Sequence, residues 1–469
     1  DAIRGMLEKL DPHSAYSTAE QTKRLNEPLQ GSFDGIGVQF NILDDTLMVI
    51  QTITGGPSEK AGVMAGDRII SVADTTIAGV KMPQEEIMKR LRGPRGTTAH
   101  LGILRDGIED TIYIDVVRDK IPLNSVDAAF MVTQHTGLIR FSNFSITTHK
   151  EVTTAIEELK QKGMRNLILD LTQNGGGYLQ AAAELASEFL PKGDMVVYTK
   201  GRTGYASQTM RSFGGDAFQE GKVVVLVDEY SASAAEILAG AIQDQDRGIV
   251  VGRRTFGKGL VQRPVNLPDG SMIRLTISKY YTPSGRCIQK PYEKGKEKEY
   301  RMDVINRFNH GELTNADSIH FPDSLKFHTL RKGRTVYGGG GIMPDYFVPL
   351  DTTKNTSLYR QIVAKRILID ANLRHLAKHR NELKEKYPTF EDFRHKYEVP
   401  EEIIENIYAE AKKALKDKYP KDEEEKTTGL LKLMLRALAA RDLWDMNEYF
   451  AIIYEDDDIV KKAVQLMEE

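Results

Sequence analysis

Between about residues 121 and 349, strand-like apolar runs alternate with stretches whose apolar residues recur at helical spacing. The segments 166–171 and 223–228 contain uninterrupted apolar runs, which are typical of strands buried on both faces of a parallel sheet. Helical patterns follow them at 179–189 and 233–244. This alternation predicts an α/β core whose functional loops lie at the strand ends.

The regions on either side of this core have different patterns. From about 31 to 118, short alternating apolar runs are separated by turn signals, which predicts a small β-rich domain. Beyond Pro349 the glycines thin out, and apolar residues such as Ile362, Ile367 and Leu373 recur at helical spacing. We therefore expect an α/β multi-domain protein. Its predicted parts are a helical connector at 1–30, the β-rich domain at 31–118, the α/β core at 119–350 and an α-helical extension at 351–469.

Composition excludes several classes of partner and site but does not identify the partner that the protein has. The 64 basic and 67 acidic residues nearly balance, so no bulk charge attracts nucleic acid or anionic lipid. The single cysteine, Cys287, excludes an intramolecular disulfide and a paired-cysteine zinc site. No stretch approaches the roughly 18 continuous apolar residues of a membrane span. The chain begins at Asp1 rather than methionine, which is compatible with the removal of a leader or an anchor segment.

Ser233, at the predicted turn from strand to helix, is the first candidate for chemistry. Its hydroxyl would be presented at the sheet edge, where the unpaired N–H groups and positive dipole end of the helix stabilise an oxyanion. The structural alternative is strong, because Ser233 and Glu236 fit the capping-box pattern and Ser231 could equally be the cap. Taken alone, this segment favours capping.

The next segment places one lysine, Lys258, between two glycines. For this lysine to act as a general base, its pKa must fall from about 10.4 toward about 7, which burial near Phe256 and Leu260 would achieve. A solvated surface lysine is the commoner alternative. The spacing Gly252 to Lys258 also matches a phosphate loop, but Gly259 replaces the hydroxyl residue that holds magnesium, and a strand rather than a helix follows.

Two glycine-rich loops are candidates for binding through backbone N–H groups. Gly175-Gly176-Gly177 follows the strand 166–171, and its backbone could form half of an oxyanion hole. In the β-rich domain, Gly35-Ile36-Gly37-Val38 precedes an alternating strand. Its N–H groups would capture a carboxylate, and the strand would pair with an extended peptide. The alternatives are an ordinary glycine turn and a bulged strand entry.

Together these segments resemble the carboxy-terminal processing proteases, or tail-specific proteases, a family of Ser-Lys serine peptidases with an inserted PDZ domain. The resemblance extends from about Leu10 to Pro349. Thr172 and Ala235 depart from the usual pattern, and the helical extension has no matching motif. The matching motifs are Leu10–Tyr16, Gly35–Val38, Pro57–Asp67, Asp170–Gly177, Ser231–Gly240, Thr255–Gly259, Tyr281–Arg286 and Gly339–Asp345.

The resemblance implies a role for each candidate residue. Ser233 would be the nucleophile and Lys258 the general base, because the family separates the two by 25 positions, which selects Ser233 over Ser231. Gln262 would be the third polar residue of the catalytic site. Four extended residues span about 13 Å, so a bulge or bend is needed to bring Gln262 near Lys258. The N–H groups of Gly177 and Ala234 would form the oxyanion hole.

The resemblance therefore implies a serine endopeptidase that recognises substrates by their carboxy-terminal ends at the loop Gly35 to Val38, without metal or cofactor. The expected partners are proteins or peptides with apolar C-terminal tails, and no nucleic acid. The helical extension would hold an adaptor or drive self-association, because amphipathic helices bury their apolar stripe against a partner. The family also implies export to the periplasm or another cell-envelope location, with any membrane anchor in an N-terminal segment outside this chain. The rivals are a non-catalytic peptide-binding scaffold and a nucleotide-dependent enzyme that uses 252–258.

Overall fold

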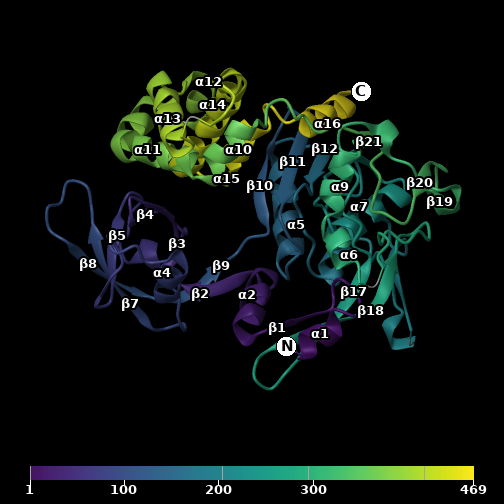
Figure 1. The fold of residues 1–469 in the computed structure, drawn as a ribbon. Coiled ribbons are helices and arrows are strands. Elements are labelled where there is room, and N and C mark those ends of the chain that lie inside the picture. The colour runs from purple at the N-terminus through teal and green to yellow at the C-terminus, as the bar shows by residue number, and fades with distance from the viewer. Residues whose placement is uncertain (1, 203, 294, 417) are drawn as a thin grey trace. The chain divides into compact units, whose positions relative to one another are not determined.

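The computed structural model describes residues 2–202, 204–293, 295–416 and 418–469. They divide into two compact units, each assembled from segments that are distant in the sequence (Figure 1). The α/β multi-domain fold, with an inserted β-rich domain and a helical C-terminal region, is confirmed. Unit 1 consists of Asp1–Gly31, Asn124–Asp351 and Tyr454–Glu469, and unit 2 of Ser32–Leu123 and Thr352–Ile453.

A six-stranded sheet forms the centre of unit 1. β10 is antiparallel to β11, and every other neighbouring pair is parallel, as the apolar runs predicted. Parallel strands end at the same edge, so the loops after them gather there. In spatial order the strands are β10 (Val126–Met131), β11 (Thr136–Phe141), β12 (Asn166–Asp170), β15 (Val223–Val227), β16 (Ile249–Gly252) and β21 (Tyr346–Phe347).

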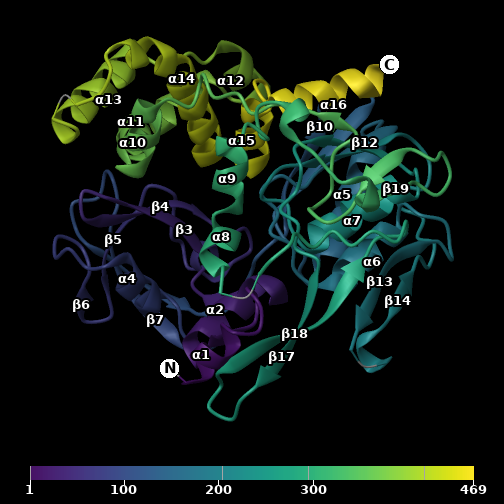
Figure 2. The ribbon, with the colours of Figure 1, turned by 45° about the vertical axis from the view of Figure 1, so that its right-hand side comes forward.

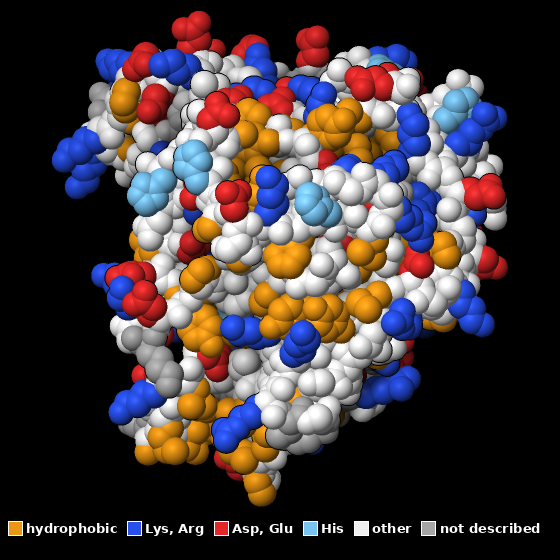
Figure 3. Space-filling view, turned by 90° about the vertical axis from the view of Figure 1, so that its right-hand side faces the viewer, with side chains coloured by type: hydrophobic (Ala, Val, Ile, Leu, Met, Phe, Trp, Pro, Cys, Tyr) orange, Lys and Arg blue, Asp and Glu red, His pale blue; other side chains and the backbone are white. Residues whose placement is uncertain are grey.

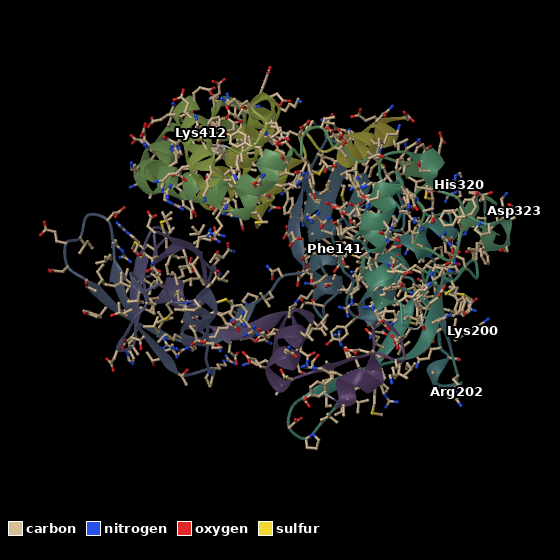
Figure 4. The ribbon with its side chains drawn as sticks, viewed as in Figure 1. Phe141, Lys200, Arg202, His320, Asp323 and Lys412 are labelled. Carbon is tan, nitrogen blue, oxygen red and sulfur yellow. The ribbon has the colours of Figure 1, made fainter. Side chains whose placement is uncertain are left out.

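Both faces of this sheet are buried. Leu167 and Leu169 of β12 belong to one large apolar cluster with the helices α5, α6 and α7, while Ile168 between them is equally buried on the opposite face. α16 contacts β15 and β16. Phe141, labelled in Figure 4, ends β11 and packs its ring edge-on against Phe144. The helices are α5 (Thr148–Gln161), α6 (Leu179–Ser187), α7 (Ala234–Asp244) and α16 (Asp458–Glu468).

A second sheet of unit 1 is built around β18, which pairs with β1, β13 and β17. β17 and β18 form a long hairpin that is prominent in Figure 2. The N-terminal segment joins this sheet through β1, so the predicted connector is part of unit 1. The strands are β1 (Ala15–Ser17), β13 (Met195–Gly201), β14 (Thr209–Arg211), β17 (Leu260–Asn266) and β18 (Met272–Tyr281). The remaining elements include α1 (Ala2–Leu7), α2 (Ala19–Gln30), α8 (Glu297–Arg301), α9 (Asp303–Asn309), β19 (Lys326–His328) and β20 (Thr335–Tyr337).

The β-rich part of unit 2 is a twisted antiparallel sheet with its own core. β3 lies at the edge of this sheet, since it pairs only with β4. Its apolar residues pack against a cluster that includes Ile87 and Leu91 of α4. A strand-like peptide could therefore add beside β3. The elements are β2 (Ser32–Gly35), β3 (Val38–Leu43), β4 (Thr46–Thr52), α3 (Pro57–Lys60), β5 (Arg68–Val72), β6 (Thr75–Thr76), α4 (Gln84–Leu91), β7 (Thr98–Leu104), β8 (Ile112–Val117) and β9 (Asp119–Pro122).

The second part of unit 2 is helical, as the spacing of apolar residues beyond Pro349 predicted. Its helices share one apolar core. Leu373 of α11 also packs against Met48 and Ile50 of β4, so the two parts of this unit share a small cluster. The helices are α10 (Ser357–Ala364), α11 (Ile367–Lys386), α12 (Phe390–Lys396), α13 (Glu401–Ala414), α14 (Asp422–Leu443) and α15 (Met446–Ile453).

The surface carries both signs of charge. Lys and Arg side chains stand among Asp and Glu side chains on the face drawn in Figure 3, in keeping with a net charge of −3. Among the described residues, no helix has the length and apolar character needed to cross a bilayer.

Candidate active site

Ser233 occupies the turn between β15 and α7. Its backbone has φ 59° and ψ −114°, a region in which residues other than glycine are strained. Such strain is typical of a serine held at a sharp strand-to-helix turn with its hydroxyl exposed. Ser231, in contrast, is fully buried, and its hydroxyl donates to the carbonyl of Leu171 at 2.7 Å. Ser231 therefore has a structural role, whereas Ser233 lines a cavity of about 600 Å³.

The buried carboxyl group of Glu236 connects the serine segment to the lysine segment. Its Oε2 accepts hydrogen bonds from the amides of Ser233 and Lys258, both at 2.8 Å. Its Oε1 accepts from the amide of Gly257 at 2.7 Å and the hydroxyl of Thr255 at 2.5 Å. Burial raises the pKa of Glu236 to about 7, against the lowering effect of these four donors. The residue that completes the capping box thus also fixes the lysine loop.

Tyr280 of β18 makes a second connection between the same two segments. Its hydroxyl lies 3.0 Å from the carbonyl oxygen of Ser233 and also bonds the carbonyl of Lys258. The residue is fully buried, and burial raises the pKa of its phenol well above the ordinary value, so the hydroxyl stays a donor. No pattern in the sequence singled out this residue. The available signal was a tyrosine beside the matching motif that begins at Tyr281.

Lys258 lies in the loop between β16 and β17 and lines the same cavity as Ser233. Burial, followed by the charge of Arg274, lowers the pKa of Lys258, while Glu236 acts in the opposite direction. Leu260 beside it is buried, as expected. A lysine whose pKa is lowered in this way can accept a proton from a neighbouring hydroxyl.

Gln262 lies in β17, where the register against β18 shifts between Val261 and Gln262. The four-residue separation of Lys258 and Gln262 requires such an irregularity if both side chains are to meet. Gln262 lines the cavity, and its side-chain nitrogen donates to the carbonyl of His13. Its catalytic role stays a prediction.

His13 brings the N-terminal motif Leu10–Tyr16 to the site, a role that the sequence analysis did not assign. Its Nε2 lies 2.7 Å from the hydroxyl of Tyr300. Burial, followed by the charge of Lys258, lowers the pKa of His13 to about 4, so the imidazole is neutral near pH 7. A neutral ring here avoids placing another cation near Lys258.

The glycine triplet after β12 lies against the turn that carries Ser233. A Cβ atom at Gly176 would be 2.8 Å from the Cβ of Ser233 and 2.9 Å from the amide nitrogen of Ala234. Only glycine permits this approach. Ala234 begins α7, so its amide has no acceptor within the helix. Gly177 and Ala234 both line the cavity. Their assignment to an oxyanion hole stays a prediction.

In unit 2, the predicted carboxylate loop connects β2 to the edge strand β3. Gly37 has φ 75°, and the carbonyls of Ile36 and Gly37 accept bonds from Ser58 and Ile53. These bonds hold the loop beside β3, which pairs with β4 and with no other described strand, while Ile36 is buried in the core. Carboxylate binding by Gly35, Ile36, Gly37 and Val38 stays a prediction. Among the residues that the structure describes, no group of three or more His, Cys, Asp or Glu side chains is arranged to hold a metal ion.

Comparisons with known proteins match three stretches of the chain. The family models are peptidase family S41 over residues 135–298, the PDZ domain over 35–116, and a family of unknown function over 358–445. The carboxyl-terminal-processing protease of Synechocystis is 38% identical over 297 residues, which cover 62% of this chain and 68% of that protein. The carboxy-terminal-processing protease of Bartonella bacilliformis is 36% identical over 293 residues, which cover 62% of this chain and 66% of that protein.

A solved structure, the photosystem II D1 C-terminal processing protease, is 31% identical with a TM-score of 0.36, covering 62% of this chain and 78% of that chain. The chain spans 66% of the Bartonella protein and 61% of the carboxy-terminal processing protease of Bacillus subtilis, less than two thirds of each.

A serine at a strained strand-to-helix turn and a lysine of lowered pKa thus line one cavity in a chain that matches peptidase family S41. Together with the PDZ match it defines a class, the serine peptidases that carry a PDZ domain. The chain belongs to peptidase family S41, the family of the carboxy-terminal processing proteases. This confirms the family that its motifs predicted.

Proposed function

We propose that this protein is a serine endopeptidase that selects proteins by their carboxy-terminal tails and cleaves them through a Ser-Lys acyl-enzyme mechanism. The observation that carries the proposal is the double link between Ser233 and Lys258. Glu236 accepts from both amides, and the hydroxyl of Tyr280 shares its one proton between both carbonyls. Two residues 25 positions apart are thus fixed on one cavity wall, with the lysine pKa lowered.

In the proposed reaction, neutral Lys258 removes the proton of the Ser233 hydroxyl. The alkoxide attacks the scissile carbonyl, and the amides of Ala234 and Gly177 stabilise the oxyanion. The protonated lysine then gives its proton to the leaving amine. Water hydrolyses the acyl-enzyme with Lys258 acting again as the base, and Gln262 orients this lysine.

Cleavage of an unfolded protein with an apolar carboxy-terminal tail tests this chemistry. We expect Ser233→Ala and Lys258→Ala each to lower kcat/KM by at least about 1,000-fold, because the two residues act as one unit. Lys279→Ala, an exposed lysine of β18, is the control and should retain activity. An inactive wild type that still binds the tail would favour the scaffold instead.

The proposed tail recognition takes place in the β-rich part of unit 2. The free edge of β3 would pair with the last residues of the substrate, and the loop Gly35 to Val38 would bind the terminal carboxylate. In Ser233→Ala, a tail with a free carboxylate should bind at least about tenfold more tightly than the same tail with an amide end. Equal affinities would contradict carboxylate capture while leaving the peptidase chemistry untouched.

A further inference from the structure

The catalytic cavity has an uneven distribution of charge. Among the described residues that line it, the charged side chains are Lys258 and Arg274, and no carboxylate is present. Lys258 has a lowered pKa and must be neutral to act as a base. The side chain of Arg274 is a guanidinium, which is a permanent cation in proteins. The cavity therefore presents one permanent charge to a substrate, and that charge is positive.

Arg274 is held in a strand rather than a mobile loop. It lies in β18 opposite Pro264 of β17 and Ala15 of β1, so both sides of its backbone are paired. Its Nε is buried and has no hydrogen-bond partner among the described residues. Arg274 lines the same cavity as Lys258. Its charge also contributes to the lowered pKa of Lys258 and of His13.

Three arginines of unit 1 whose side chains are largely covered have protein carboxylates as partners. Arg286 pairs with Asp244 at 2.6 Å, Arg140 with Asp170 at 2.7 Å and Arg253 with Glu229 at 2.7 Å. No described carboxylate pairs with Arg274 in this way. Arg274 thus brings to the cavity a cation that no described carboxylate neutralises, and a carboxylate of the substrate would supply that partner.

We propose that Arg274 binds a carboxylate of the substrate inside the catalytic cavity, so that an acidic group near the scissile bond selects the cleavage site. The inference rests on the proposed peptidase function of this cavity. A guanidinium forms two parallel hydrogen bonds with a carboxylate, which an amide of the same shape cannot match. The carboxylate could belong to an Asp or Glu side chain or to a free chain end, and the experiment separates the two sources.

Peptides of one sequence with an amidated carboxy-terminus provide the first arm, so that no chain-end carboxylate is available to the loop proposed to bind it in unit 2. Glu replaces Gln at one position at a time around the cleavage site. Binding is measured with Ser233→Ala by fluorescence anisotropy, and cleavage with the otherwise unchanged enzyme. In a second arm, Gln peptides that end near the cleavage site carry either a free carboxylate or an amide.

We expect the Glu peptide to bind at least about tenfold more tightly than the Gln peptide at one or two positions. Arg274→Gln should abolish this difference in affinity. Arg274→Lys should retain only part of it, because lysine keeps the positive charge but cannot donate two parallel hydrogen bonds to a carboxylate. Arg263→Gln, an exposed arginine of β17, is the matched control and should retain the full difference. A preference confined to the second arm would assign the carboxylate to the chain end.

Equal binding of Glu and Gln peptides at every position, together with no preference for a free end, would overturn the proposal. A preference that survives in a folded Arg274→Gln variant would do so as well. Cleavage of Glu and Gln peptides at equal rates would reject this inference and leave the peptidase function intact. Binding that depends on Arg274 without any cleavage would instead retain carboxylate recognition and reject the peptidase function.

The pH profile supplies a readout that a purely structural role would not change. Lys258 faces the charges of Arg274 and Glu236, with His13 nearby. A carboxylate bound to Arg274 would offset its charge and raise the pKa of Lys258. The acidic limb of kcat should therefore lie at higher pH for the Glu peptide than for the Gln peptide, and this displacement should vanish in Arg274→Gln.

Discussion

At the scale of single residues, Glu236 combines two tasks that usually fall to different side chains. It completes the helix start at Ser233, and it accepts the amides of Gly257 and Lys258 from another loop. All four of its partners donate, so the site requires an acceptor at every position. Replacement by glutamine would direct an NH₂ group at N–H donors.

Glu236→Gln should therefore lower both stability and activity. We expect a loss of about 2–4 kcal/mol in the free energy of unfolding, from buried donors left without acceptors, and at least about a 100-fold loss of kcat/KM from misplacement of Lys258. Denaturant unfolding and peptide cleavage measure the two effects. Glu184→Gln, on the neighbouring helix α6, is the control. Unchanged activity in Glu236→Gln would show that Glu236 does not position Ser233 and Lys258 for catalysis.

His13 makes a pH-dependent contribution at the same scale. Its pKa is about 4 in the folded protein and about 6.5 when exposed, because burial and Lys258 disfavour the charged ring. The stabilisation is therefore present above pH 6.5 and is lost as the pH falls toward 4. Between pH 7.5 and 5, the wild type should lose about 2 kcal/mol more than His13→Gln. Urea unfolding at both pH values measures this, and equal losses would argue against a buried neutral histidine.

At the scale of elements, the loop after β12 positions the turn that begins α7. Gly176 has φ 93°, and a Cβ there would lie 2.6 Å from the carbonyl oxygen of Ala232. Gly176→Ala should cost more than about 2 kcal/mol through backbone strain and displacement of the serine turn. It should also lower kcat/KM by at least about 100-fold. Gly175→Ala is a matched control, because no atom lies within 4 Å of a Cβ at that position. Similar behaviour of the two variants would contradict this packing argument.

The elements of the core were predictable because strands buried on both faces leave a continuous apolar run. The strand predicted at 223–228 is observed as Val223–Val227, and the helix predicted at 233–244 as Ala234–Asp244. Pairing between distant segments was not predictable in the same way. The bonds of Tyr280 to Ser233 and Lys258 depend on how β17 and β18 pair, and local patterns carry no information about such contacts. Family resemblance selected Ser233, whereas the residue pattern alone favoured capping.

At the scale of the whole molecule, the C-terminal segment returns to unit 1 after the helices of unit 2. Tyr454 is buried, and its hydroxyl bonds the carboxylate of Asp170 at the end of β12, beside Arg140. α16 follows and buries Ile459 and Val460 where it contacts β15 and β16. The last residues of the chain thus help to cover the sheet whose strand ends carry the candidate site.

Substitutions that remove these contacts should lower the free energy of unfolding of unit 1, by more when more buried apolar surface is lost. Tyr454→Phe should cost about 1–2 kcal/mol, because the charged pair of Asp170 and Arg140 loses a hydrogen-bond partner. Ile459→Ala should cost about 2–4 kcal/mol through a cavity against the sheet. Glu468→Ala, an exposed residue at the end of α16, is the control for both. Thermal unfolding combined with cleavage measures whether the destabilised variants lose the site together with the sheet. If activity survives at temperatures where Ile459→Ala has lost protection of the β15 amides in hydrogen exchange, the C-terminal segment does not support the site.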